Sequence, residues 1–222
     1  MQIIDKKGLL VRTKNPDKIT SYIQKSRVVG SPAEGMYDVL VYFNMVNARI
    51  LQNLGFKKTP APIEVDYGWP GMYKPFDHQK ETASFLTLHR RAFCLNEQGT
   101  GKTGSAIWAA DYLMKLGKIK RALIICPLSI MDSAWRADLF NFAMHRTVDI
   151  AHSSGTKAAQ RRKEIINGEA EFVIINYDGL NIVEEEIKKA GFDLIIVDEA
   201  NAYKNAQTTR WKTLNKIGRA HV

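Results

Sequence analysis

The stretch that decides the fold is Asn96-Glu97-Gln98-Gly99-Thr100-Gly101-Lys102-Thr103. It follows the apolar run Ala92–Leu95 and leads into an amphipathic segment near Gly101–Leu116. Glycines let backbone amides close around phosphate oxygens, and the start of a helix adds a partial positive charge. The pattern G-x-x-x-x-G-K-T fails only at Asn96, where the first glycine is expected. The stretch therefore predicts a strand, a phosphate-binding loop and a helix.

Nucleotide-binding candidates in this loop are Gln98, Gly99, Thr100, Gly101, Lys102 and Thr103. We expect Lys102 to contact the β- and γ-phosphates and Thr103 to offer its hydroxyl to Mg²⁺. The alternative is a glycine-rich turn before an ordinary helix.

A second stretch, Phe192–Glu199 (FDLIIVDE), is an apolar strand candidate that ends in two acids. In parallel α/β sheets, ligands bind at the carboxyl ends of the strands. We expect Asp198 to hold Mg²⁺ and Glu199 to orient and deprotonate the attacking water. Lys102, Asp198 and Glu199 are thus the candidate catalytic residues. An acidic pair alone is more often an exposed loop, but a phosphate loop about 100 residues upstream favours the nucleotide interpretation.

Short apolar runs alternate with longer amphipathic segments from residue 75 onward, which predicts crossover connections and a mostly parallel α/β sheet. The expected strands are Ala92–Leu95, Ala122–Cys126, Val148–Ala151, Phe172–Ile175 and Leu194–Val197. The expected helices lie near Asp77–Arg90, Gly101–Leu116, Ile130–Phe142, Lys157–Asn167 and Leu180–Ala190.

Residues 1–58 predict a separate small α+β module, residues 59–74 a linker rich in proline and glycine, and residues 75–222 the main domain. The expected elements of the module are a strand over Ile3–Val11 that a turn at Asp5–Gly8 interrupts, a helix over Pro16–Val29 capped by Asn15, a strand over Tyr37–Phe43 and a helix over Met45–Leu54 capped by Asn44.

Composition points to an intracellular protein with a polyanionic partner. The 222 residues carry a net charge of +9, and residues 1–74 alone hold 11 basic against 6 acidic side chains. No apolar run approaches the ~18 residues of a membrane span, and the N-terminus lacks a signal sequence. We expect a cytoplasmic, nucleoid or nuclear protein that is not secreted. Cys94 and Cys126 predict reduced thiols.

The two stretches resemble the motifs of superfamily-two helicases, in the Swi/Snf form. Asn96–Thr103 is similar to the first motif, and Asp198-Glu199-Ala200-Asn201 is similar to the Asp-Glu-Ala-His box. The resemblance implies a RecA-like ATP-binding domain that uses ATP and Mg²⁺ and moves on nucleic acid, with double-stranded DNA as the expected partner. Asn201 stands where the family has histidine, the side chain that helps couple the nucleotide site to the partner lobe.

Further motifs follow in the family's order. Phe76-Asp77-His78-Gln79 resembles the glutamine motif that reads adenine, and an amide can both donate to and accept from that base. The resemblance assigns nucleic-acid contacts to Pro127, Ser129, Asn176 and Tyr177, and Lys204-Asn205 matches the segment after the acidic box. Trp135 fits core packing better than base stacking. The basic run Gln160–Lys163 fits a solvated face and a phosphate-contacting face equally well.

The family's third motif and second RecA-like lobe, with its arginine finger, lie outside these 222 residues. We therefore expect a fragment that binds ATP and hydrolyses it poorly. Residues 1–58 more weakly resemble the HARP-like modules of annealing-type translocases. Three alternatives remain: a strand-separating or restriction-type motor, a nucleotide-gated binding module without turnover and, disfavoured, a metabolic kinase with a phosphate loop.

Overall fold

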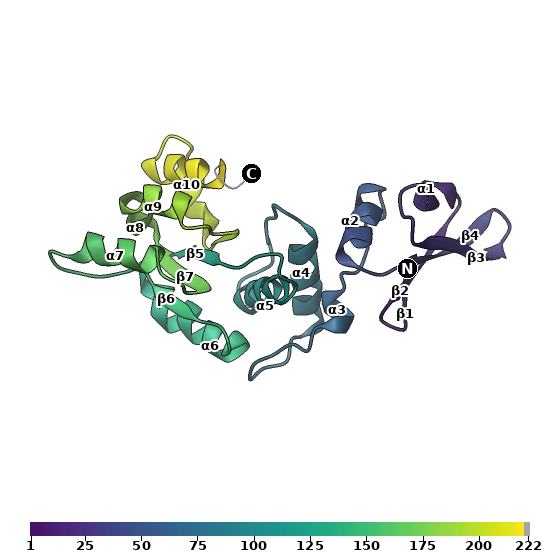
Figure 1. Ribbon diagram of the computed structural model, residues 1–222, viewed down its shortest axis with the longest axis horizontal. Coiled ribbons are helices and arrows are strands. Elements are labelled where there is room, and N and C mark those ends of the chain that lie inside the picture. Colours follow the sequence, from purple (N-terminus) through teal and green to yellow (C-terminus); the bar gives the residue numbers. More distant parts are fainter. Residues whose placement is uncertain (220–222) are drawn as a thin grey trace. The chain divides into compact units, whose positions relative to one another are not determined.

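The computed structural model describes residues 1–219 and consists of two compact units (Figure 1). The first unit contains Met1–Gly68 and Phe76–Thr100; the second contains Trp69–Pro75 and Gly101–Val222. Each unit is described by itself. No helix among the described residues is long and apolar enough to cross a membrane.

The second unit is built on a four-stranded sheet in the order β6-β7-β5-β8. Its strands are β5 (Ala122–Cys126), β6 (Val148–Ile150), β7 (Phe172–Asn176) and β8 (Leu194–Val197). Every neighbouring pair in this sheet is parallel, with Ile124 opposite Ile174 on one side and Ile196 on the other. This confirms the α/β class with a parallel sheet.

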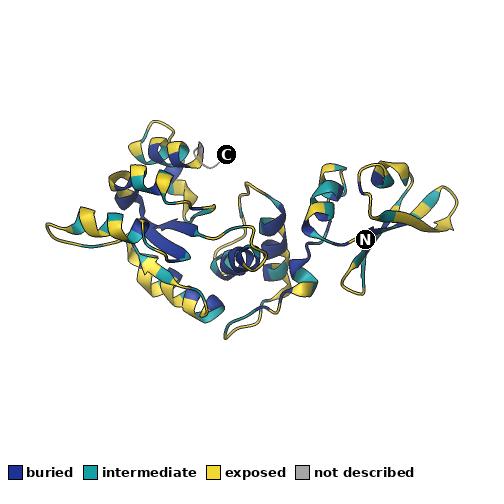
Figure 2. Ribbon diagram, in the orientation of Figure 1, coloured by how far each residue is buried: buried dark blue, intermediate teal, exposed yellow. Residues whose placement is uncertain are grey.

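Alternate residues of β5 and β7 enter two separate apolar cores, one on each face of the sheet. Ile124 and Phe172 belong to one core, and Leu123 and Val173 to the other. Both strands are buried at every position (Figure 2). Continuous apolar runs form strands here because both sheet faces are covered.

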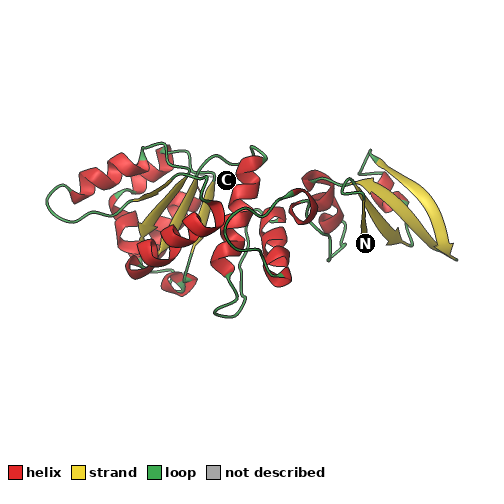
Figure 3. Cartoon of the chain, turned by 90° about the horizontal axis from the view of Figure 1, so that it is seen from below, coloured by secondary structure: helices red, strands yellow, loops and turns green. Residues whose placement is uncertain are grey.

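Helices cover both faces of this sheet (Figure 3). The first core receives residues of α5 (Lys102–Lys115), the π-helical stretch η2 (Met131–Arg136) and α6 (Ala137–Ala143). The second receives residues of α7 (Ala158–Ile166), α8 (Tyr177–Ile182), α9 (Glu184–Lys189), the short helix η3 (Ala200–Tyr203) and α10 (Thr209–Arg219). A further turn, η1 (Leu128–Ile130), follows β5.

Two expectations for residues 75–222 are wrong. Ala92–Leu95 is not a strand, and Phe93 and Leu95 are 77% and 87% exposed. An apolar run of four residues predicts a strand only if a neighbouring strand satisfies its amides, and the described residues supply none. The helix expected over Leu180–Ala190 is instead two helices, α8 and α9, that meet at Val183.

The first unit begins with an antiparallel sheet in the order β1-β2-β4-β3. Its strands are β1 (Gln2–Ile4), β2 (Gly8–Thr13), β3 (Ser26–Ala33) and β4 (Met36–Tyr42). The turn expected between Ile3 and Val11 separates β1 from β2, with Asp5 and Lys6 at φ of 47° and 58°. Ile4 pairs with Gly8, so the hairpin loop has three residues, and two of them have positive φ.

The helix expected over residues 16–29 is wrong beyond its first turn. Only α1 (Asp17–Thr20) forms, with the side chain of Asn15 accepting from the amide of Lys18, and β3 begins at Ser26. Val28 pairs with Val39 of β4. The β-branched pair Val28-Val29 and the strand beside it outweigh the local helical signal.

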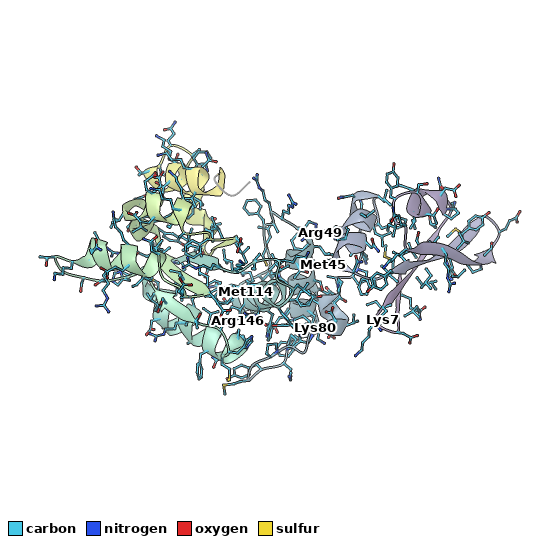
Figure 4. All side chains as sticks on the ribbon, in the orientation of Figure 1. Lys7, Met45, Arg49, Lys80, Met114 and Arg146 are labelled. Atoms are coloured by element: carbon cyan, nitrogen blue, oxygen red, sulfur yellow. The ribbon has the colours of Figure 1, made fainter. Side chains whose placement is uncertain are left out.

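Three helices complete the first unit: α2 (Met45–Asn53), α3 (Ile63–Asp66) and α4 (Asp77–Leu88). Asn44 caps α2 as expected, since its side chain accepts from the amide of Asn47 at 2.8 Å. Arg49 of α2 donates to the carbonyls of Thr87 and Leu88 at the end of α4 (Figure 4). The segment expected to be a linker holds α3.

Candidate functional site

Asp198 follows β8 directly, and its amide donates to the carbonyl of Ile125 in β5 at 2.9 Å. The next residue, Glu199, is left-handed, with φ of 49° and ψ of 53°. Its amide donates to Oδ1 of Asp198 at 2.9 Å. Non-glycine residues in this conformation store strain and concentrate at functional sites. The acid pair therefore stands at the carboxyl edge of the sheet in a defined turn.

Trp135 fixes the other oxygen of this carboxylate. Its indole Nε1–H donates to Oδ2 of Asp198 at 2.9 Å, and the side chain is 2% exposed. Trp135 lies in η2, on the connection that follows β5, and packs in the first core. The expected core packing of Trp135 is confirmed, and the hydrogen bond adds a contact with the acid.

Tyr177 holds the backbone of the same turn from the second core. Its hydroxyl donates to the carbonyl of Asp198 at 2.7 Å, and its ring meets Tyr203 edge-on. Burial, and then the charge of Asp198, raises the pKa of Tyr177 well above its ordinary value. The hydroxyl therefore stays protonated and acts as a donor.

Cys126 ends β5 beside this turn. Burial, together with the negative charge of Asp198, raises the pKa of its thiol to about 12. Cys126 and Cys94 are both free. That the thiols are reduced stays a prediction, and Cys126 is a neutral packing group at physiological pH.

Lys102 and Thr103 form the first turn of α5, which begins after Gly101 in the left-handed conformation (φ 72°). The first turn carries no acidic residue, so nothing there offsets the partial positive charge of the helix start. A Cβ at Gly104 would approach the ring of Phe142 to 3.2 Å, so α5 packs closely against α6 at this point. These features suit binding of an anion.

The remainder of the loop, Asn96–Thr100, belongs to the first unit and is held by α4. The side-chain Nδ2 of Asn96 donates to the hydroxyl of Thr82 at 2.8 Å. Nε2 of His78 lies 3.1 Å from the carbonyl oxygen of Thr100. Gly99 has φ of 79°, which an L side chain rarely adopts. Asn96 thus uses its side chain to fix the loop where the pattern has glycine, while Gln98 and Gly99 are exposed.

Gln79 is 8% exposed, and its Oε1 accepts from the amide of Phe76 at 2.9 Å. This is the reciprocal half of a capping box at the start of α4. Adenine recognition by Gln79 stays a prediction, because the acceptor oxygen already serves the helix start.

The four nucleic-acid candidates have different surroundings. Ser129 is exposed and Pro127 half-buried in the turn after β5, whereas Asn176 and Tyr177 are 8% and 9% exposed. Direct contact with a large ligand is therefore open to Pro127 and Ser129, while Tyr177 serves the acidic turn. Oδ1 of Asn176 is buried without a hydrogen-bond partner, so its role stays a prediction.

The basic run on α7 is partly engaged within the protein. Lys163 pairs with Glu186 at 2.7 Å, Gln160 donates to Glu164, and Arg162 donates to the carbonyl of Ser153. Arg161 is exposed. The helix therefore offers at most part of this run to a phosphate backbone.

The donor set suits Mg²⁺ in a nucleotide complex. Within residues 1–219, no three His, Cys, Asp or Glu side chains gather into a closed metal cluster. Mg²⁺ with a nucleotide needs only one or two protein ligands, because phosphate oxygens and water supply the others. Each oxygen of Asp198 accepts one hydrogen bond, which leaves about two of roughly four acceptor positions available. Asp198 and Thr103 therefore fit the ion.

Sequence reasoning missed the residues that position the two loops. A buried indole N–H needs an acceptor, which is the one signal for the bond from Trp135 to Asp198. The acceptor itself depends on the pairing of β5 with β8, which the sequence did not predict. Thr82 carried no signal, since a threonine on a helix is common, and His78 was named only as part of the glutamine motif.

The SNF2-related domain model matches residues 78–221. The chain belongs to this SNF2-related family. Helicase SWR1 of Candida albicans is 28% identical over 172 residues, which are 76% of this chain and 10% of the relative. The ISWI chromatin-remodeling complex ATPase ISW2 of Saccharomyces cerevisiae is 28% identical over 138 residues, which are 60% of this chain and 12% of the relative. The SNF2-related chain thus spans about a tenth of these relatives.

A solved structure shares the fold: the Sulfolobus solfataricus SWI2/SNF2 ATPase core in complex with dsDNA. It superposes with a TM-score of 0.58 at 24% identity and covers 67% of this SNF2-related chain and 31% of the Sulfolobus chain. The expected Swi/Snf resemblance and RecA-like fold are confirmed. The HARP-like character of residues 1–58 stays a prediction.

Proposed function

We propose that this chain is the ATP-binding lobe of an ATP-dependent motor that moves along double-stranded DNA. The observation that carries the proposal is the acidic turn, in which Asp198 follows the parallel strand β8 and has both carboxylate oxygens hydrogen-bonded. Membership of the SNF2-related family supports it, as do relatives named as a helicase and an ATPase.

In this proposal the loop Asn96–Thr103 binds the phosphates of ATP. Backbone amides of Gln98, Gly99, Thr100 and Gly101 and the start of α5 face the anion, while Lys102 neutralises the outer phosphates. The chain alone should bind ATP and hydrolyse it slowly, because a second lobe of the family supplies an arginine finger.

Asp198 and Thr103 would hold Mg²⁺, which when bound neutralises charge on the phosphate oxygens. Glu199 would orient the attacking water and accept its proton. Its left-handed backbone sets the direction in which the carboxylate leaves the turn. Asp198 and Glu199 lie in the same unit as Lys102 and Thr103. The second unit therefore supplies all four of these residues.

For the nucleic acid, we propose contacts from Pro127 and Ser129, in the turn after β5. Residues just past strand ends present amides and hydroxyls that bind phosphates. The Sulfolobus structure with double-stranded DNA supports DNA as the track. We also propose contacts from Asn176 and Tyr177, although their burial favours an indirect role for them.

We extend the proposal to residues 1–58 as a separate module that holds DNA near the motor, with residues 59–74 as its connection. A cavity of about 480 Å³ on the N-terminal sheet is lined by Lys7, Lys25, Arg27 and Tyr42, among others (Lys7 in Figure 4). Lys25 lies 5.2 Å from the ring centroid of Tyr42. Cations beside an exposed aromatic ring suit a nucleic-acid strand.

The rival function of this module is a structural cap. Arg49 binds the end of α4, so deleting residues 1–58 would also uncap the helix that carries Gln79. Point variants separate the two functions. Lys25→Glu with Arg27→Glu should make the salt dependence of DNA affinity shallower by about 1.8 in log–log slope, near 0.9 per lost phosphate contact. The matched pair Lys14→Glu with Lys18→Glu, exposed on the same module, should change it less. An equal effect of both pairs would favour the cap.

The alternative function for the whole chain is a nucleotide-gated binding module without turnover. Single-turnover hydrolysis of ATP, measured with and without duplex DNA, separates the two. Slow hydrolysis that DNA accelerates and that Glu199→Gln abolishes supports the motor, whereas stable ATP under all conditions supports the binding module.

A further inference from the structure

Two buried tryptophans of the second unit, Trp108 and Trp135, donate their indole N–H to acceptors that differ in kind. Trp108 donates to the backbone carbonyl of Pro70 at 3.0 Å, and Trp135 donates to the carboxylate of Asp198 at 2.9 Å. Both are buried, at 0% and 2% exposure. A backbone carbonyl is the ordinary partner of a buried indole. Packing of Trp135 in the core does not by itself require that its indole donate to a carboxylate at a candidate metal site.

Trp135 lies on a π-helical stretch of backbone, which affects where its side chain is placed. Residues Met131–Arg136 form a π-helical stretch between the turn Leu128–Ile130 and α6. Such stretches widen a helix by one residue and occur often at functional sites. Met131 and Trp135 both enter the first core from this stretch.

The carboxylate of Asp198 has one orientation under these contacts. Oδ1 accepts from the amide of Glu199, and Oδ2 accepts from Trp135. The first contact fixes only one oxygen, and rotation about the last side-chain bond of an aspartate is broad when nothing else holds it. The indole is the second point that fixes the plane of the carboxylate.

We propose that Trp135 is a positioning residue for Mg²⁺, acting through Asp198. This inference rests on the proposed function, because it requires nucleotide with Mg²⁺ at Asp198. The indole N–H orients the carboxylate so that its remaining acceptor positions face the ion and its water. Outer-shell partners of metal ligands typically change metal affinity by roughly 10- to 100-fold when removed.

The experiment replaces Trp135 by β-(3-benzothienyl)alanine, which keeps the ring shape and substitutes sulfur for N–H. The same replacement at Trp108 is the matched control, since it removes an indole hydrogen bond of similar length from an equally buried site. Fluorescent ATP analogue is titrated onto the whole 222-residue chain over a range of Mg²⁺ concentrations. Binding is measured, so no turnover is needed.

We expect the Trp135 variant to need about 10-fold or more Mg²⁺ for half-maximal nucleotide binding. Its nucleotide binding without Mg²⁺ should stay near that of the unaltered chain. The Trp108 variant should need about the same Mg²⁺ concentration as the unaltered chain. In an Asp198→Asn background, the Trp135 replacement should have no further effect on the Mg²⁺ requirement. A merely structural role would instead lower binding with and without Mg²⁺ alike, and in both backgrounds.

An unchanged Mg²⁺ requirement in the Trp135 variant, or equal shifts at Trp135 and Trp108, would overturn this inference and leave the proposed function standing. Absence of nucleotide binding by the unaltered chain would overturn both. If the Trp135 variant fails to fold, the indole ¹⁵N–¹H signals of the unaltered chain supply the same test. Addition of Mg²⁺ with nucleotide should shift the Trp135 signal more than the Trp108 signal, and equal or absent shifts would contradict the inference.

Discussion

The phosphate loop and the acidic turn serve one proposed ligand, but the protein holds them by different means. In the phosphate loop, backbone amides and a helix start are the binding groups. The side chain of Asn96 donates to Thr82 of α4, and the hydroxyl of Thr100 donates to the carbonyl of Glu97 within the loop. In the acidic turn, a side chain is the binding group, and the buried residues Trp135 and Tyr177 fix it. Apart from Lys102, a site built from backbone amides tolerates change in its side chains, whereas a side-chain site depends on the residues behind it.

The largest expected effect is that of Lys102→Ala in the phosphate loop. It removes the cation placed at the outer phosphates, so ATP affinity should fall on the order of 100-fold, as for loss of more than one hydrogen bond to a charged group. Calorimetric titration measures it. Lys118→Ala, beyond the far end of the same helix, is the control and should leave affinity unchanged. Equal affinity in the Lys102 variant would sink the loop assignment.

In the acidic turn, Asp198→Asn and Glu199→Gln should separate binding from chemistry. Asn keeps the size of the side chain but replaces one acceptor oxygen with an NH2 donor, so it loses one of the two hydrogen bonds and weakens the metal ligand. The gain in ATP affinity on adding Mg²⁺ should therefore shrink about 10-fold or more. Glu199→Gln should bind ATP with Mg²⁺ normally and fail to hydrolyse it. Equal losses of Mg²⁺-dependent binding in the two variants would show that the roles are wrongly divided.

Gln79 lies on α4, the helix whose Thr82 holds the phosphate loop through Asn96. Gln79→Ala should lower the free energy of unfolding by about 1 kcal/mol, because it removes the capping interaction with Phe76. If Gln79 also reads adenine, preference for ATP over GTP should shrink. Gln79→Glu is the sharper variant: it keeps the acceptor and removes the amide donor. Retained stability with lost preference supports adenine recognition, and an unchanged preference argues against it.

The smallest expected effect is that of Thr82→Val. This variant removes the acceptor for Asn96 and should weaken ATP binding several-fold, equivalent to about 1 kcal/mol for one hydrogen bond. Thr87→Val is the control on the same helix. Thr87 is also buried, and its hydroxyl donates to the carbonyl of Ser84 at 2.8 Å. If both variants weaken ATP equally, Asn96 does not position the loop.

Much of the second unit could be predicted because its signals are local and repeated. Ala122–Cys126 and Leu194–Val197 are strands with the bounds expected from their apolar runs. Ala92–Leu95 carries a similar signal yet forms no strand, because pairing depends on a neighbour that a local pattern does not specify. The helix expected over residues 16–29 failed for the same reason, as Val28 and Val29 belong to a strand beside β4.

The candidate site shows the same division. Lys102, Asp198 and Glu199 could be named from spacing alone. The roles of Trp135, Tyr177 and Thr82 depend on hydrogen bonds between residues 14 to 63 positions apart in the chain. Such contacts follow from the packing of helices on a sheet and not from any local pattern.

The most direct test of the account is a calorimetric titration of ATP onto the unaltered chain, with Mg²⁺ and with excess chelator. We predict saturable one-to-one binding that Mg²⁺ strengthens, because Lys102 and the amides of the loop bind the phosphates and Asp198 holds the ion. The Mg²⁺-dependent part should shrink about 10-fold or more in Asp198→Asn and persist in Glu199→Gln. Absence of binding, or binding that chelator leaves unchanged, would contradict the account.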